Sequence, residues 1–138
     1  MNPILNTGLL IGALCAVWMF VCGVTGWYKD PKLNLLFFLV IPIEIGGLIW
    51  GLRQTAREGR TYLAQIVAGT MMAVIAGVVI IVASLAFTAM YPEAMEALRA
   101  ADPSATPMSQ ALSGFIGTLV TGILASAAIA VAVRAPRR

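Results

Sequence analysis

The sequence contains no histidine and few charged residues. Without histidine, the chain lacks the commonest side chain for metal ligation, haem ligation and general base catalysis. Binding of haem or a pigment through an imidazole of this chain is therefore excluded. Charged residues make up 11% of the chain, whereas soluble domains usually have about 25%. Such a chain cannot cover a water-facing surface with charge, so its composition predicts an integral membrane protein.

The few charges are also unevenly distributed along the chain. None occurs from Thr61 to Pro92, and none from Pro103 to Val133. Each of these stretches exceeds the roughly 20 apolar residues that a membrane-spanning helix needs. The first ten residues carry no basic side chain, so we do not expect a cleaved signal peptide at the start.

Cysteine is scarce, with Cys15 and Cys22 the two examples. On a helix, residues seven positions apart share a face but lie about 10.5 Å apart along the axis. A disulfide requires Cα atoms within about 7 Å. The two cysteines therefore cannot bond to each other, and we interpret them as small apolar packing residues.

The apolar stretches predict an all-α membrane protein, with residues 1–138 as a single membrane domain. We expect four transmembrane helices in a compact bundle, at about 4–24, 33–52, 62–90 and 111–133. The third is too long for a perpendicular crossing, so it must tilt. Between the third and fourth spans, Pro92 followed by Glu93 is a favourable helix start. We therefore predict a short surface helix there, ending before Pro103.

Four spans place both termini on one side of the membrane, together with the link at 53–60. That side carries more basic residues than the other, which has Lys29, Lys32 and Arg99. By the positive-inside rule, we expect cytoplasmic termini in a bacterial inner membrane. We interpret the basic residues as topology-setting groups or contacts to anionic lipid head groups, and we expect no binding to nucleic acid. These residues are Arg53, Arg57, Arg60, Arg134, Arg137 and Arg138.

Small residues recur at intervals of four in every predicted span. In lipid, helices associate by close packing, so such residues mark the faces that meet other helices. The predicted helix-packing residues are Gly8, Gly12, Gly47, Gly51, Gly69, Ala73, Gly77 and Gly117.

Glu44 is the one acidic residue inside a predicted span. It shares a helix face with Gly47 and Gly51, so we expect it to point at another helix. Pro42 deprives the carbonyl of Phe38 of its usual helical donor, and a protonated Glu44 could help to satisfy the backbone there. Because no span offers a basic partner, we expect Glu44 to be neutral. Two interpretations stay open, a packing or hydrogen-bonding residue and a proton carrier.

Reaction machinery is missing from the sequence. There is no histidine-based triad, no cysteine–histidine pair, no pair of carboxylates in the spans and no phosphate-binding glycine loop. We therefore predict no enzymatic activity, no cofactor and no metal site.

The chain nevertheless resembles a known family over nearly its whole length. The resemblance rests on "TGLLIGALCAVWMFVCGVTGWY", "FFLVIPIEIGGLIWGLRQTAREGRTYLAQIVAGTMMAV", "YPEAMEALR" and a final glycine- and alanine-rich span ending in arginine. In this order they are similar to the DUF4199 family of bacterial four-span membrane proteins of unknown function. The most specific parts are Ile41-Pro42, the arginine-rich link ending near Gly59, and "YLAQIVAG". The chain departs from the family at Glu44, where an apolar residue is usual, and the resemblance implies no catalytic residues.

Two functional hypotheses follow. The first is an accessory or structural subunit that packs against a larger bacterial membrane complex, for example a photosynthetic or respiratory energy-converting assembly. Its partners would be membrane lipids and other membrane protein subunits. The alternative is a small proton-coupled transporter or channel that uses Glu44, since small multidrug transporters of similar size also use a membrane glutamate.

Overall fold

The computed structural model describes residues 2–26, 32 and 38–134, with the side chains of the last helix as far as Ala132. Over these residues the chain is helical, as predicted, and contains no strand. The helices are α1 (Pro3–Thr25), α2 (Val40–Ala56), α3 (Tyr62–Met90), α4 (Pro92–Ala101) and α5 (Pro107–Arg134). The short α4 lies between the third and last apolar helices, where a short helix was expected.

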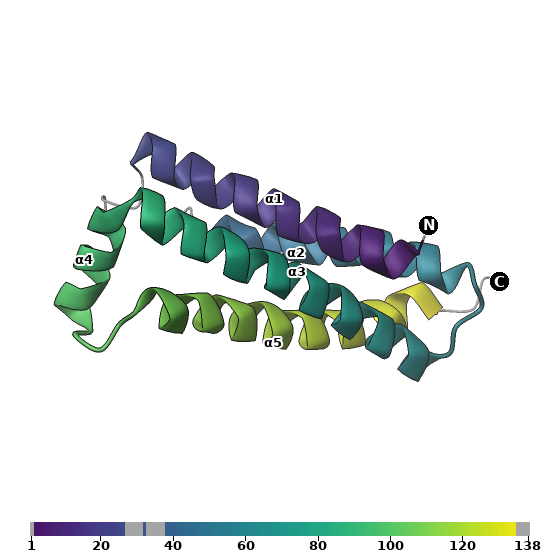
Figure 1. Ribbon diagram of the computed structural model, residues 1–138. Coiled ribbons are helices and arrows are strands. Elements are labelled where there is room, and N and C mark those ends of the chain that lie inside the picture. The colour runs from purple at the N-terminus through teal and green to yellow at the C-terminus, as the bar shows by residue number, and fades with distance from the viewer. Residues whose placement is uncertain (1, 27–31, 33–37, 135–138) are drawn as a thin grey trace.

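The long helices run lengthwise beside one another (Figure 1). Helix α3 lies between α1 and α5 and contacts both, while α2 lies behind them and also packs against α1 and α5. Helix α4 crosses one end of the molecule and joins α3 to α5. The opposite end is formed by the start of α1, the link between α2 and α3, and the last turns of α5. We call it the arginine end, because Arg53, Arg57 and Arg60 lie there.

Local capping explains most of the helix boundaries. The side chain of Asn2 accepts a hydrogen bond from the N–H of Ile4 at the start of α1, and Thr61 caps α3 in the same way. Gly26 ends α1 with a φ of 72°, and Gly59 turns the α2–α3 link with a φ of 74°. Only glycine adopts this left-handed conformation without strain.

Three helices of the described residues are long and apolar enough to cross a membrane, rather than the predicted four. They are α1, α3 and α5 over Pro107–Ala132. Helix α2 has 17 residues. At 1.5 Å per residue it spans about 25 Å, less than the roughly 30 Å of a hydrocarbon core. The predicted second span began at 33, but residues 33–37 lie outside the described part of the chain, and α2 itself begins at Val40.

The late start of α2 corrects the role expected of Pro42. Pro42 is the third residue of α2, inside the first turn. The N–H groups of a first turn have no partner within the helix, so a proline there removes no hydrogen bond. The carbonyl of Phe38 precedes α2 and loses no helical donor to Pro42. The proposed backbone reason for a polar group at Glu44 is therefore wrong.

Glycines allow α1 to lie directly against α3. A Cβ on Gly12 would lie 2.6 Å from the Cβ of Val79, and a Cβ on Gly8 would lie 2.7 Å from that of Ile75. Around these contacts, Ile11 and Met72 are completely buried and belong to one continuous apolar core. The backbones of the two helices approach closely because these two positions lack side chains.

This packing predicts the effect of filling one glycine position. Gly12→Leu should lower the free energy of unfolding by about 1–3 kcal/mol, because the added side chain overlaps Val79. The measurement is denaturant-induced unfolding in detergent micelles, followed by circular dichroism. Gly117→Leu is the matched control, since a Cβ there meets nothing within 4 Å. Equal destabilisation by both variants would contradict the packing described.

Candidate functional site

Glu44 is buried where the helices meet, with 4% of its surface exposed. Its Oε1 atom is enclosed and has no hydrogen-bond partner among the described residues. Gly122 of α5 lies in front of this oxygen, since a Cβ on Gly122 would be 3.2 Å from it. The same Cβ would overlap Ala73 of α3. On the α1 side, Cys15 is close enough to interact electrostatically with Glu44. The acid therefore points into the protein.

Among the described residues, no salt bridge joins a cation to this carboxyl group. The ion pair found in the described part of the chain joins Arg60 to Glu58, far along the sequence from Glu44. No group of three potential metal ligands occurs among the described residues. An isolated carboxylate is costly to bury in an apolar environment, so this arrangement favours the protonated, neutral acid.

Two further buried polar atoms lie in the same interior. Thr7 of α1 and Ser126 of α5 are both completely buried, and the hydroxyl oxygen of each has no partner in the described residues. Thr7 lies against Gly51 of α2, and Ser126 lies against Gly69 of α3. Sequence reasoning did not select Thr7 or Ser126 as site residues. One sequence signal could have pointed to them, namely a hydroxyl residue close to a helix-packing glycine. Thr7 is next to Gly8, and Ser126 lies four residues after Gly122.

A satisfied polar pair lies closer to the arginine end. The hydroxyl of Thr55 on α2 donates to Oε1 of Gln65 on α3, and both residues are buried. The side-chain amide of Gln65 donates to the backbone oxygen of Leu52 at 3.3 Å. These bonds join the end of α2 to the beginning of α3. Gln65 lies in the "YLAQIVAG" stretch, but its pairing could not be deduced without knowing which residue faces it.

These residues form successive layers through the interior. The first holds Thr55 and Gln65, which lie at the end of α2 and the start of α3, next to the link at the arginine end. The second holds Thr7 and Ser126. Thr7 contacts Gly51 of α2, and Ser126 contacts Gly69, which also lies against Leu52 of α2. Gly51 and Leu52 are neighbours in the sequence, so Thr7 and Ser126 lie at the same level. Glu44 lies deeper, seven residues before Gly51 on α2, which is about 10.5 Å along the helix axis.

Most of the predicted helix-packing residues face another helix of this chain. Besides Gly8 and Gly12, the residues that contact another helix are Gly47 against Ile11, Gly51 against Thr7, Gly69 against Ser126, Gly77 against Phe115 and Ala73 against Gly122. Gly117 differs from the prediction: it is exposed, and a Cβ there would meet nothing within 4 Å. It therefore packs on no other helix of the described chain.

The predicted lipid-contacting arginines that the structure describes lie at the arginine end. Arg53 and Arg57 are exposed at the end of α2. Arg60 pairs with Glu58, with Nε and Oε2 3.0 Å apart. Arg134 is the last residue of α5. Arg137 and Arg138 lie outside the described residues. The exposed positions of Arg53 and Arg57 suit contacts to anionic head groups.

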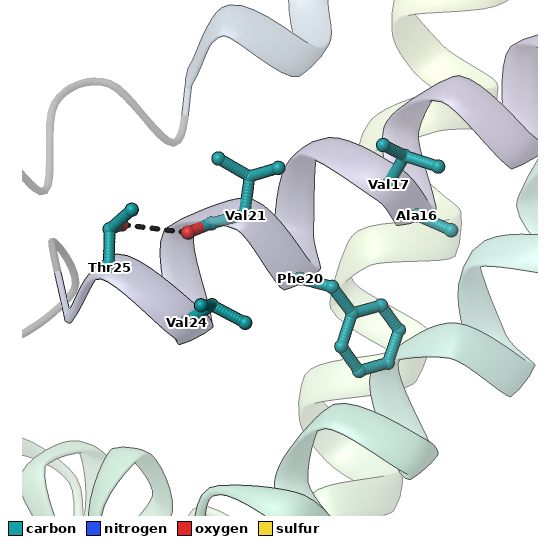
Figure 2. Close-up of a pocket in the computed structure, with 6 residues that line it drawn as sticks. All are labelled: Ala16, Val17, Phe20, Val21, Val24 and Thr25. Atoms are coloured by element: carbon teal, nitrogen blue, oxygen red, sulfur yellow. Dashed lines mark hydrogen bonds between the residues drawn. The ribbon is translucent and has the colours of Figure 1, made fainter.

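An open apolar groove of about 450 Å³ runs along the second half of α1. Figure 2 shows the six lining residues, all on α1: Ala16, Val17, Phe20, Val21, Val24 and Thr25. The hydroxyl of Thr25 donates to the backbone oxygen of Val21, so it is already satisfied. Phe20 packs edge-on against Phe87 of α3, with ring centroids 6.0 Å apart. The groove offers apolar surface, such as a lipid chain could cover, and no reactive group.

Comparison with protein-family models, curated proteins and solved structures gives no match, so the resemblance to DUF4199 stays a prediction.

The bond between Thr55 and Gln65 can be tested with a double-mutant cycle. We expect Thr55→Val and Gln65→Leu each to lower the free energy of unfolding, and the pair to show a coupling of about 0.5–1.5 kcal/mol. Detergent unfolding followed by circular dichroism gives the four free energies. Thr55→Val combined with Thr88→Val serves as control, because Thr88 bonds locally to Leu85 at the far end of α3. Strictly additive effects for Thr55 and Gln65 would rule out the bond.

Proposed function

We propose that this chain is a non-catalytic integral membrane protein that docks onto other membrane protein subunits through the outer face of α5. The observation that carries the proposal is Gly117, an exposed helical glycine whose Cβ position has none of the described residues within 4 Å.

The outer face of α5 is open compared with the other long helices. Within the apolar window of each helix, 22% of α5 is buried, against 44% of α1 and of α3. The exposed face carries large apolar side chains such as Ile116 and Val120, which suit a lipid or protein environment. Ser113 lies four residues before Gly117 and is also exposed. Together they leave a shallow strip in which a second helix could approach the backbone of α5.

Gly117 is better explained by an external partner than by local structure. A glycine inside a helix lowers helix stability by about 1 kcal/mol relative to alanine. Gly12, Gly51 and Gly77 compensate for this by admitting a neighbouring helix. Gly117 lies in the middle of α5, where no turn requires it. With a partner helix on this face, Gly117 would likewise allow a close approach of two helices.

We further propose that α2 is the fourth membrane crossing. It packs between α1 and α5, and its Leu48 and Leu52 are completely buried. Trp50 and Arg53 lie in its second half, toward the arginine end, as expected near a membrane interface. By the positive-inside rule, the arginine end would then face the cytoplasm of a bacterial inner membrane.

The partner would be another membrane-spanning subunit of an energy-converting complex, photosynthetic or respiratory. Lacking histidine, this chain would support such a complex without ligating its haem or pigments. The buried, unpartnered carboxyl of Glu44 favours a second candidate, a small proton-coupled transporter. Equal proton-driven transport by wild type and Glu44→Gln in proteoliposomes would eliminate a transport mechanism based on Glu44.

The docking proposal predicts a selective effect of Gly117→Leu. Extraction of the wild type in mild detergent should yield co-purifying subunits, and Gly117→Leu should lose them while keeping wild-type stability, because its side chain fills the strip.

Gly46→Leu is the matched control for this extraction. Gly46 is also an exposed helical glycine with nothing within 4 Å of its Cβ position. It is flanked at intervals of four by Pro42 and Trp50, which leave no strip of small residues. Partner loss in both variants, or a wild type that purifies alone, would contradict the proposal.

A further inference from the structure

We propose that Glu44 is a proton-binding site that exchanges its proton with water at the arginine end of the protein, and not at the α4 end. The exchange path is formed by Thr7 and Ser126, followed by Thr55 and Gln65. This inference concerns the interior of the helices and does not depend on the docking face of α5.

Three enclosed oxygens along this path have no hydrogen-bond partner in the part of the chain that the structure describes. They are Oε1 of Glu44 and the hydroxyl oxygens of Thr7 and Ser126. They come from three different helices, α2, α1 and α5. Buried polar atoms nearly always have a partner, and where protein provides none the usual partner is an ordered water molecule. The proposed path takes these three oxygens as the positions where water molecules bind.

Buried polar residues are distributed unequally on the two sides of Glu44. Thr7, Ser126, Thr55 and Gln65 all lie between Glu44 and the arginine end. Large apolar residues are buried on both sides, Ile11, Leu48 and Met72 toward the arginine end and Met19, Ile80 and Phe87 toward α4, so the difference between the sides lies in the polar residues.

On the α4 side of Glu44, the buried polar residue found among the described residues is Thr118. It lies one helical turn before Gly122 on α5. A proton moving from Glu44 toward α4 would have to pass the apolar residues beyond it without polar partners. The route toward the arginine end is therefore the favourable one.

The spacing suits a proton relay through water better than a metal cation. Thr7 contacts Gly51, which is about 10.5 Å from Glu44 along α2. A cation holds its oxygen ligands at about 2.3–2.6 Å, so it cannot touch both residues. Hydrogen-bonded oxygens lie about 2.8 Å apart, so a few water molecules could bridge this span. Hydroxyl groups both donate and accept hydrogen bonds, which allows Thr7 and Ser126 to pass a proton on.

Few other titratable groups face Glu44. The thiol of Cys15 on α1 is the neighbouring one, and its Sγ lies 3.9 Å from the backbone oxygen of Val40. Gly122 of α5 and Ala73 of α3 contribute no titratable group, and α2 has no other acid. In the exchange step, the carboxylic acid gives its proton to a water molecule and becomes a carboxylate. A proton returning along the same path restores the acid.

The test uses infrared spectroscopy of the full chain in liposomes. The C=O stretch of a protonated carboxylic acid should be present in wild type and absent in Glu44→Gln. After exchange of the buffer into D₂O, the wild-type band should shift as the acid becomes deuterated. A missing band, or a band that does not shift after hours, would overturn the proposal without any further variant.

The direction of exchange is tested by comparing variants on the two sides of Glu44. Thr7→Val and Ser126→Ala should each slow the D₂O-induced shift about tenfold, the rate effect of one missing hydrogen bond in the relay. Thr118→Val is the matched control on the α4 side and should leave the rate unchanged. Circular dichroism and unfolding measurements establish that each variant folds.

Each outcome of the comparison decides the question. Slowing by Thr7→Val or Ser126→Ala, with Thr118→Val at the wild-type rate, supports the path. Slowing by Thr118→Val, alone or together with the other variants, or wild-type rates in both Thr7→Val and Ser126→Ala, overturns it. If Ser126→Ala misfolds, Thr7→Val alone carries the comparison, because valine keeps the shape of threonine.

Discussion

Close approach of the helices at glycine is the constraint on which the rest of the structure depends. Ile11 occupies the space beside Gly47, Val79 the space beside Gly12, and Ser126 the space beside Gly69. In lipid, association of helices gains little from removing apolar surface from water, so van der Waals contact over close distances has to stabilise it. The same contacts bring Thr7, Glu44 and Ser126 into the interior, because each lies on a face that packs against a neighbouring helix.

Much of this arrangement could be predicted from the sequence. The uncharged stretches gave the bounds of α3 and nearly those of α1, because long apolar helices have few alternatives in a membrane. The helical period placed Glu44 on the inward face with Gly47 and Gly51, and the acid is indeed buried. The expected contacts at Gly12, Gly69 and Gly77 are also present, since spacing alone tells which residues share a face.

The errors have physical causes as well. Apolar composition cannot say where a helix begins within an apolar stretch, so the start of α2 at Val40 and the harmless position of Pro42 were missed. Spacing also cannot distinguish a face that meets a helix of the same chain from one that meets lipid or another protein, and Gly117 is such a case. Thr7 and Ser126 were overlooked as site residues because their importance lies in what faces them from other helices.

The bonds between Thr55, Gln65 and Leu52 also bear on how the chain enters the membrane. Helix α2 is short and carries both Glu44 and Arg53, so its own insertion into a bilayer is unfavourable compared with that of α3. The two helices are joined by a link of only a few residues and by side-chain bonds next to it. If α2 crosses the membrane as proposed, the long apolar α3 would carry it into the bilayer as the second arm of a helical hairpin. Membrane assembly of the polar arm would then depend on a glutamine near the start of its apolar neighbour.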